Sequence, residues 1–496
     1  MHGGFHYKSN KFLTFDEPIE ELSGFKIHKF NLYGHIGNPS VPVVKVGDSV
    51  KMGQLIGAEE NNSGINIFSS VSGKVIDINS IYITIENDFL DDYVPLKKLE
   101  NPTKNEILAR IKEAGIIGMG GAGFPTFIKY QTDKKIDILI LNGAECEDYI
   151  TTDDLVMSTY STQVLQGAIL LAKIHDIKNI LVGIEKDKTQ AIKYMKESAE
   201  VLSSKQDADI NPNIKIVPIK AKYPHGAEKM LIKTLTGKEV KENALPADIG
   251  IIVNNVHTAY SVFRAVTLGE PCIKRVITVS GRAVVNKGNY LVRTGSSVGD
   301  IFHSAGGVVY EPKKLEDYKK FAKDRLKACE ELAEKMHIAE EKQEKKQCEI
   351  KLKQEIKDTN KEIYKRYKIA MEGARNNLVK ILAGGPFMGV QIDEEYCIEL
   401  RTSAILFLAE NEIIDYMPSA CINCKKCARV CPVSILPMQI NDYADIKNYE
   451  ECKKLNVESC IECGACSYVC PAKIPLAYNM KAAKKVVKNL FKKNKK

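Results

Sequence analysis

Two cysteine runs near the C-terminal end carry the strongest chemical signal in the sequence. They read Cys421-x2-Cys424-x2-Cys427-x3-Cys431-Pro and Cys460-x2-Cys463-x2-Cys466-x3-Cys470-Pro. In this spacing three thiolates bind one 4Fe-4S cluster, and the fourth thiolate reaches another cluster. The sequence therefore predicts two clusters, one held by Cys421, Cys424, Cys427 and Cys470 and the other by Cys460, Cys463, Cys466 and Cys431.

A zinc site is the alternative interpretation of these cysteines. One tetrahedral zinc would use two separated C-x-x-C pairs and leave half of the eight thiols idle. Nine of the 14 cysteines lie from Cys421 to Cys470, a density that in a reducing compartment indicates metal rather than disulfides. Cys452, between the two runs, is most simply a bystander. Because clusters carry one electron at a time, another group must feed them.

A glycine-rich stretch upstream could hold a phosphate or a ring. It runs Gly118-Met-Gly120-Gly121-Ala-Gly123-Phe124, ahead of a segment compatible with a helix that contains Lys129. Glycines let backbone N–H groups approach a ligand closely, and a lysine neutralises its charge. Taken alone, an ordinary turn would explain such a loop.

Three further motifs follow in order, and the set resembles a known domain. They are Asn142-Gly-Ala-Glu145-Cys-Glu147, Tyr223-Pro-His-Gly226-Ala-Glu228 and Val253-Asn254-Asn255-Val-His-Thr258. With the glycine-rich loop, they resemble the FMN- and NADH-binding domain of the complex I flavoprotein. The resemblance implies NADH contacts from Phe124, Glu147 and Glu228. It implies FMN contacts from Gly118, Gly120, Lys129, Asn142, Glu145, Tyr223, Gly226, Asn254, Asn255 and Thr258. For any one of these residues, a satisfied turn or cap is the alternative.

Two modules are expected to precede and to position these groups. Residues 1–100 contain short β-rich runs with Gly turns, which predict a small β-sandwich. It resembles the barrel-sandwich hybrid of lipoyl carriers, but residues 57–70 contain no lysine to modify, so we expect a docking module. Residues 101–272 alternate helical periods with buried strands, which predicts an α/β domain with a largely parallel sheet. Ligands of such sheets bind at Gly-rich loops and helix N-termini.

The remaining residues predict a second β-module and a helical C-terminal domain. Residues 273–400 return to short strands and resemble a β-grasp module of the SLBB type, interrupted by a charged helical segment at 311–378. One helix of that length would reach about 100 Å, so a helical hairpin is expected. Residues 401–480 form the expected double 4Fe-4S ferredoxin-like domain. Residues 481–496 are a basic tail, either a helix that touches acidic lipid or a partner, or a solvated end.

Composition limits the classes of function. The chain has 496 residues, 44% hydrophobic and 27% charged, which is ordinary for soluble multidomain proteins. No apolar run approaches the roughly 18 residues that cross a bilayer, and the N-terminus does not resemble a signal peptide, so a cytoplasmic location is expected. The net charge, 71 − 63 = +8, falls heavily on the last segment and does not by itself indicate nucleic acid.

The order of the modules resembles the RnfC family of the Rnf electron-transport complex over nearly the whole chain. This resemblance implies hydride exchange between NADH and FMN and single-electron transfer through two 4Fe-4S clusters. It also implies membrane flavoprotein partners, an indirect link to ferredoxin, coupling to ion translocation and a peripheral position on the cytoplasmic face of the membrane. The sequence departs from the pattern at Ala144, where complex I has an aspartate, at Asp148, where a proline is usual, and at Gly3-Gly4-Phe-His, which lacks a following double proline.

Two other functions fit parts of the sequence. One is a soluble electron carrier of the same type that serves a reductase, such as proline reductase or cobalamin reductase; the N-terminal sandwich disfavours the cobalamin case. The other is a non-enzymatic scaffold in which the clusters only stabilise the fold. The intact flavin motifs disfavour the scaffold.

Overall fold

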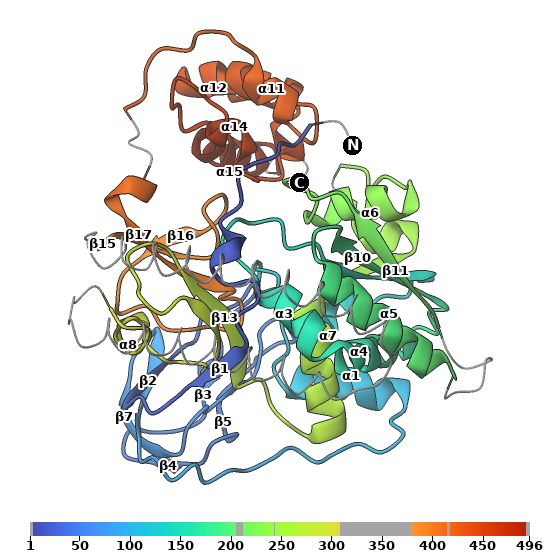
Figure 1. Cartoon of the computed structure of the whole chain (residues 1–496), viewed down its shortest axis with the longest axis vertical. Helices are drawn as coiled ribbons and strands as arrows, with labels where there is room; N and C mark the ends of the chain where they lie inside the picture. Colours follow the sequence, from blue (N-terminus) through green and yellow to red (C-terminus); the bar gives the residue numbers. More distant parts are fainter. Residues whose placement is uncertain (1–2, 205–211, 243, 308–377, 414–416, 493–496) are drawn as a thin grey trace, which may run out of the picture.

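A computed structural model describes residues 3–204, 212–242, 244–307, 378–413 and 417–492. Figure 1 shows the helical C-terminal domain at one end of the molecule, above the sheets and helices of the remaining modules. The helical hairpin expected at 311–378 lies outside the described residues, except for Leu378, which begins strand β15.

The sandwich predicted near the N-terminus is confirmed. Its two antiparallel sheets have the strand orders β2-β8-β7-β4 and β3-β5-β6. Alternate residues such as Ile83 and Ile85 are fully buried between them, as expected for packed sheets. The strands are β2 (Ile27–Asn31), β3 (Val41–Pro42), β4 (Ser49–Val50), β5 (Leu55–Ala58), β6 (Ile67–Phe68), β7 (Gly73–Ile78) and β8 (Tyr82–Asn87).

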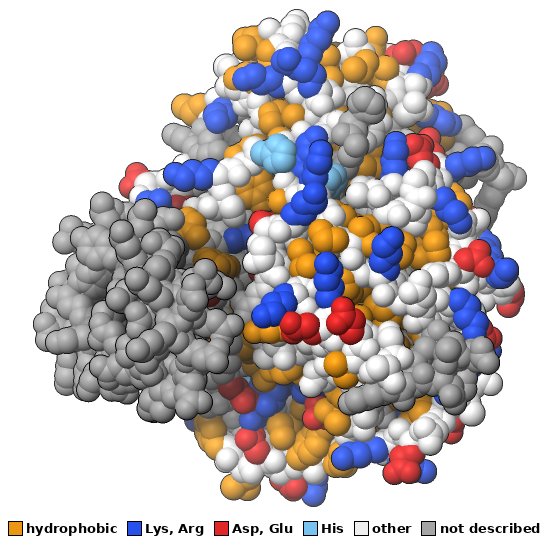
Figure 2. All heavy atoms as spheres, turned by 45° about the vertical axis from the view of Figure 1, so that its right-hand side comes forward, with side chains coloured by type: hydrophobic (Ala, Val, Ile, Leu, Met, Phe, Trp, Pro, Cys, Tyr) orange, Lys and Arg blue, Asp and Glu red, His pale blue; other side chains and the backbone are white. Residues whose placement is uncertain are grey.

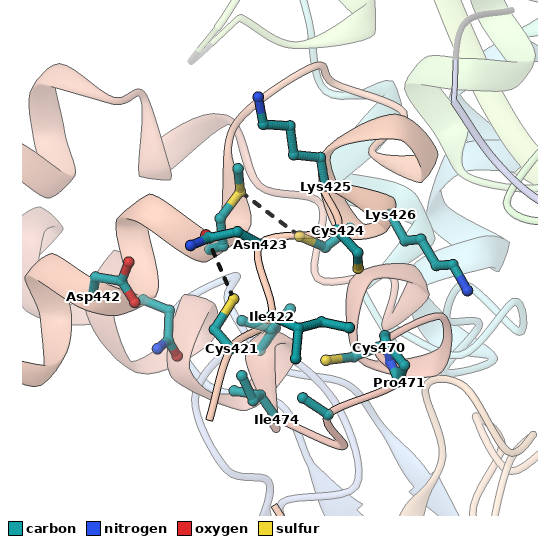
Figure 3. Close-up of a pocket in the computed structure, with 15 residues that line it drawn as sticks. Cys421, Ile422, Asn423, Cys424, Lys425, Lys426, Asp442, Cys470, Pro471 and Ile474 are labelled. Carbon is teal, nitrogen blue, oxygen red and sulfur yellow. Dashed lines mark hydrogen bonds between the residues drawn. The ribbon is translucent and has the colours of Figure 1, made fainter. Parts of the chain in front are cut away.

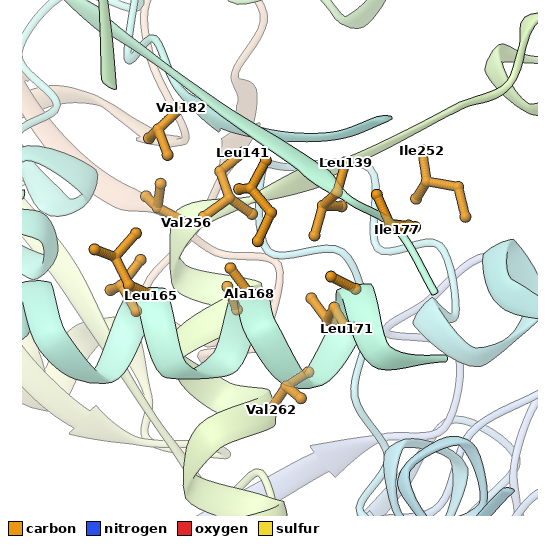
Figure 4. Packing of buried hydrophobic residues seen from close by; sticks show 14 of the residues in the cluster. Leu139, Leu141, Leu165, Ala168, Leu171, Ile177, Val182, Ile252, Val256 and Val262 are labelled. Carbon is orange, nitrogen blue, oxygen red and sulfur yellow. The ribbon is translucent and has the colours of Figure 1, made fainter. Parts of the chain in front are cut away.

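The second module has a four-stranded sheet in which all strands are parallel, in the order β11-β10-β9-β12. Side chains of β9 alternate between its faces: Leu139 and Leu141 pack toward α3, α4 and α7, and Ile140 packs toward α6. Figure 4 shows Leu139 and Leu141 above Leu165 and Ala168 of α4. The elements are α1 (Lys104–Glu113), α2 (Thr126–Tyr130), β9 (Ile138–Gly143), α3 (Thr152–Thr159), α4 (Ser161–Lys173), β10 (Asn179–Glu185), α5 (Thr189–Ser204), β11 (Asn213–Ile219), α6 (Glu228–Thr236), β12 (Ile251–Asn255) and α7 (Val256–Phe263).

The strand order of this sheet creates a switch point between β9 and β12. From β9 the chain moves outward through β10 and β11, and it then returns to the other side of β9 to form β12. Ligands of open parallel sheets bind outside the carboxyl ends of the strands at such a point. Asn142 and Asn255 are paired there in the strand register.

The third module is a six-stranded mixed sheet with the order β1-β14-β13-β17-β15-β16. Helix α8 packs on it through Val298 and Ile301. The N-terminal strand β1 pairs in parallel with β14, so residues 19–22 belong to this sheet and not to the sandwich. The elements are β1 (Ile19–Leu22), β13 (Lys274–Ser280), β14 (Gly288–Arg293), α8 (Val298–Ser304), β15 (Leu378–Ala383), β16 (Val390–Ile392) and β17 (Ala404–Ala409).

The C-terminal domain is helical, and its last helix replaces most of the expected basic tail. Helix α15 runs without interruption from Leu476 to Lys492, and Met480, Ala483 and Val487 are buried in the domain core. This apolar spacing is helical, with the lysines between. The prediction of a separate tail from residue 481 was therefore wrong. The other helices are α11 (Lys426–Val430), α12 (Pro437–Asp445), α13 (Tyr449–Lys454) and α14 (Ala465–Tyr468).

The surface carries charges of both signs. On the face in Figure 2, Lys and Arg side chains are spread among acidic and apolar ones. Among the described residues, no single helix has the length and apolar composition to cross a membrane; α3 and α4 meet that test only as a pair bent by 95°.

Candidate functional site

The eight motif cysteines lie in two groups with the crossed membership expected from the sequence. One cavity is lined by Cys421, Cys424, Cys427 and Cys470, and Figure 3 shows three of them around it. The second cavity is lined by Cys431, Cys460, Cys463 and Cys466. Each fourth cysteine thus leaves its own run because the short helices α11 and α14 carry the chain across to the other cavity.

The size and lining of these cavities fit clusters better than single ions. Their empty volumes are about 430 and 350 Å³, part of which is open to solvent. Apolar side chains such as Ile422 and Ile474 complete the first wall. Within the described ranges, no three His, Cys, Asp or Glu side chains are placed to hold one metal ion, which disfavours the zinc alternative. A four-iron cluster instead needs thiolates arranged around a cavity.

The glycine-rich loop folds over the start of helix α7. The Gly118 N–H donates to the Phe124 carbonyl at 2.8 Å, and the Met119 N–H donates to Thr258 Oγ1 at 2.9 Å. Asn255 caps the helix N-terminus. Free N–H groups at a helix N-terminus attract anions, so the loop and helix together suit a phosphate.

The asparagine motifs meet at the switch point. Asn255 Nδ2 lies 3.5 Å from the Asn142 carbonyl, and Asn142 Nδ2 donates to the Gly226 carbonyl at 2.8 Å. Asn254 Oδ1 accepts from the buried Tyr130 hydroxyl at 2.9 Å. Residues from three distant motifs therefore lie together, as predicted.

Lys129 and Glu228, another predicted pair, lie beside strand β12. Lys129 Nζ donates to the Val253 carbonyl at 2.9 Å and forms an ion pair with Glu228 at 3.3 Å. Since Gly120 also lies near Asn255, where an added Cβ would be 3.4 Å from the amide side chain, these residues border the same region.

Glu145 supplies the test of whether a cofactor fits this region. It is buried, and its Oε1 accepts from the Thr152 hydroxyl and the Asp153 N–H, both at 2.9 Å. Its Oε2 is also buried but has no hydrogen-bond partner among the described residues. Such an oxygen is costly unless a ligand donates to it. Hydroxyl and N–H groups of FMN are suitable donors, so the residues present fit this cofactor.

Sequence reasoning missed a group of buried charges beside Glu145. Lys11, from the N-terminal segment, donates from Nζ to the Glu145 carbonyl. Lys188 and Asp154 form a buried ion pair at 3.3 Å, and Glu185 is buried at the end of β10. A charge that ends an apolar strand could have suggested Glu185, but no local pattern connects Lys11 with a motif far along the chain.

These buried carboxylates predict a pH dependence of stability. Burial raises the pKa of Glu185 from 4.5 to about 7, and it raises those of Glu147 and Asp153 to about 7 as well. Between about pH 4.5 and 7 the folded state therefore binds more protons than the unfolded chain, so stability falls as the pH rises through this window. For Glu185 the shift corresponds to on the order of 3 kcal/mol.

We expect the melting temperature to decrease from pH 5 to pH 8 and the decrease to be smaller in Glu185→Gln. Scanning fluorimetry across this range measures both slopes. The exposed Glu200 on α5 provides the control variant, Glu200→Gln, which should keep the wild-type slope. Equal slopes in all three proteins would contradict the prediction.

Tyr223 connects the flavin motifs directly with the second cysteine cavity. Its hydroxyl donates to the Cys463 carbonyl at 2.6 Å and lies 3.3 Å from Glu147 Oε1. The other Glu147 oxygen accepts the Phe387 N–H at 3.0 Å. Glu147 therefore lies between the flavin motifs and the C-terminal domain.

Comparison with known proteins supports this division of the chain. Residues 111–264 match the Nuo51 FMN-binding domain, residues 1–93 match the RnfC barrel sandwich hybrid domain, and residues 420–474 match a 4Fe-4S dicluster domain. The cofactors expected from the motifs, FMN and 4Fe-4S clusters, are thereby confirmed.

Relatives match over almost the full chain. The RnfC protein of the proton-translocating ferredoxin:NAD⁺ oxidoreductase complex of Clostridium ljungdahlii is 34% identical, over 91% of this chain and 86% of its own. The RnfC protein of the Na⁺-translocating complex of Acetobacterium woodii is 31% identical, over 98% and 96%. A crystal structure of NAD⁺-reducing [NiFe]-hydrogenase in the H2-reduced state aligns with a TM-score of 0.37 and 26% identity, over 41% of this chain and 39% of that one.

An FMN-binding domain and a dicluster domain in one chain define a flavin- and iron-sulfur-containing electron-transfer protein. The N-terminal domain match and the long relatives make the assignment narrower. The chain belongs to the RnfC family of the ion-translocating ferredoxin:NAD⁺ oxidoreductases, the Rnf complexes.

Proposed function

We propose that this protein is the NADH-linked peripheral subunit of an Rnf complex on the cytoplasmic face of the membrane. It exchanges electrons between NADH and the membrane flavoprotein subunits, with ferredoxin reached indirectly, and the complex couples this transfer to ion movement. Two relatives support the coupling, since their names state proton and Na⁺ translocation. When bound, FMN accepts two electrons as a hydride and releases them singly, and each cluster carries one.

We assign the residues by the groups that they bring together. The eight cysteines of the two cavities are the proposed cluster ligands. The loop from Gly118 and the start of α7 hold the phosphate, whereas Asn142, Asn254 and Glu145 orient the rest of the flavin. Phe124, Glu147 and Glu228 are the proposed NADH contacts; an aromatic ring stacks on a nicotinamide or adenine ring, and carboxylates bind ribose hydroxyls.

The observation that carries the proposal is the hydrogen bond from the Tyr223 hydroxyl to the Cys463 carbonyl at 2.6 Å. It joins a residue of the flavin motifs to a loop that lines the second cysteine cavity. Electron exchange needs the two sites to be neighbours, whereas a scaffold whose clusters only stabilise the fold has no need of such a contact.

Mixing the purified protein with NADH under anoxic conditions tests the function. We expect the flavin absorbance to bleach first and the signals of reduced clusters to follow in electron paramagnetic resonance. Protein stripped of FMN is the control and should show no cluster reduction. A flavin that stays oxidised in the presence of NADH would contradict the proposal.

Membership of a membrane complex, rather than a soluble carrier role, is tested by purification. We expect integral membrane subunits to co-purify with the tagged protein from mild detergent. The match of residues 1–93 to the RnfC barrel sandwich hybrid domain supports the membrane complex. Recovery of the protein only with a soluble reductase would favour the carrier.

We also interpret the six-stranded sheet as a β-grasp module of the SLBB type. The hairpin β13–β14, helix α8 and the parallel neighbour β17 of β13 support this interpretation. The module boundaries near residues 100, 272 and 400 are part of the same proposal.

A further inference from the structure

The N-terminal segment 3–11, which we term the N-terminal strap, runs between the C-terminal domain and the flavin motifs (Figure 1). At one end the Gly4 N–H donates to the Val430 carbonyl at 2.7 Å. At the other end Lys11 donates to the Glu145 carbonyl. The strap therefore contacts both regions that electron exchange must connect.

Phe5 is the centre of the contact between these regions. It exchanges two backbone hydrogen bonds with Tyr223, at 3.0 and 3.1 Å. Its ring stacks on Tyr468 of the C-terminal domain, with centroids 4.6 Å apart and planes at 17°. The rings of Tyr223 and Phe387 lie at 5.3 and 5.5 Å. Aromatic pairs at such distances are attractive beyond their buried area.

The two glycines before Phe5 allow this close approach. Gly3 and Gly4 both have φ of +75°, and an added Cβ would lie 2.4 Å from the Cys431 carbonyl oxygen or 2.5 Å from the Tyr223 carbonyl oxygen. No other residue type fits both the backbone conformation and the space. The strap is thus built to pass directly against a cysteine of the second cavity.

Side chains alternate along the strap as on a strand. Phe5 is buried and Tyr7 is half-buried, and the Tyr7 hydroxyl donates to the Cys146 carbonyl at 2.8 Å. His6 and Lys8 are exposed. One face of the strap therefore makes the contacts, and the other face provides neutral positions for control variants.

We propose that the N-terminal strap is an interdomain clamp in which Phe5 is a positioning residue. It holds the loops around Cys431 and Cys463 against Tyr223 and so sets the rate of electron exchange between the flavin site and the second cysteine cavity. Domains joined by modest interfaces move relative to each other by default, so a fixed distance requires such a fastening. The inference rests on the proposed function.

The test compares Phe5→Ala, Tyr468→Ala and the control His6→Ala in the full-length protein loaded with both cofactors. Tyr468 is 40% exposed and approaches Phe5 from the other domain, so its variant weakens the same contact without altering the strap. Rapid mixing with NADH resolves flavin reduction from cluster reduction. Hydrogen exchange of the Gly4, Phe5 and Tyr223 amides reports the clamp without any redox chemistry.

We expect flavin reduction to stay within about twofold of wild type in all variants, while cluster reduction slows about tenfold or more in Phe5→Ala and Tyr468→Ala. Phe5→Tyr should restore the rate. Dithionite should still reduce both clusters fully. The strap amides should exchange faster in the two contact variants than in His6→Ala.

Cluster reduction at the wild-type rate in Phe5→Ala, or equal slowing in His6→Ala, would overturn the clamp. If Phe5→Ala loses iron, Tyr468→Ala decides by the same two measurements. If NADH fails to reduce the flavin in the wild-type protein, the proposed function fails; the clamp then stands or falls on hydrogen exchange alone.

Discussion

Replacing Cys470 with alanine is expected to remove the cluster of the first cysteine run, although Cys470 belongs to the second run. Cys470 lines the cavity of Cys421, Cys424 and Cys427, and the cavity of the second run is completed by Cys431 instead. Because each 4Fe-4S cluster needs its four thiolates, the variant should keep about half of the iron.

Double variants show which cluster is lost. Cys470→Ala combined with Cys421→Ala should lose no more iron than either single variant, because both changes affect one site. Cys470→Ala combined with Cys460→Ala should lose nearly all of it. Iron and sulfide analysis after anoxic reconstitution gives the contents.

Cys452 provides the matched control for these variants. It is fully buried between the two runs, and its thiol contacts the Ile440 carbonyl at 3.6 Å rather than either cavity. Cys452→Ala should therefore retain the wild-type iron content. The opposite pattern of the double variants, with Cys470 and Cys460 behaving as one site, would contradict crossed ligation.

Gly118→Ala is expected to weaken FMN binding without destabilising the protein. An added Cβ at residue 118 would have its nearest heavy atom, the Phe124 carbonyl oxygen, at 3.5 Å, which is an ordinary contact. The polypeptide thus tolerates the methyl group, but a cofactor lying against the loop would not. We expect the Kd for FMN to rise about tenfold or more, equivalent to about 1.4 kcal/mol.

Fluorescence titration of the flavin-free protein measures this Kd, and the melting temperature of the same sample checks the fold. Gly57→Ala is the control, since a Cβ there would lie 3.4 Å from Ile67 in the remote sandwich. Unchanged FMN affinity in Gly118→Ala would exclude the loop from the cofactor site. Equal loss of affinity in both variants would indicate a general loss of stability.

The features that could be predicted from the sequence are those with a local pattern. Cysteine spacing fixed the two cavities because short helices determine where each fourth thiol goes. Asn142 and Asn255 were found because each follows a buried strand, and parallel strands bring their carboxyl ends to one edge. The continuation of α15 was missed because abundant lysines obscured the apolar positions of Ala483 and Val487.

Contacts between distant segments could not be predicted in this way. The register of β1 with β14, the docking of Lys11 on Glu145 and the ring contacts of Phe5 join residues from different modules. No periodicity in either partner encodes such a pairing, because each contact depends on how whole modules pack. Only the glycine pair at residues 3 and 4 marks an unusual backbone path in advance.

The position of the N-terminal strap has a consequence for biosynthesis. Its residues leave the ribosome first, yet the surfaces that receive them, Tyr223, strand β14 and Tyr468, are translated much later. Pairings between remote parts of a chain form slowly, and domains fold as units during synthesis. The earliest segment to be made is therefore the last to dock, so nascent chains expose Phe5 and Tyr7 until translation is nearly complete.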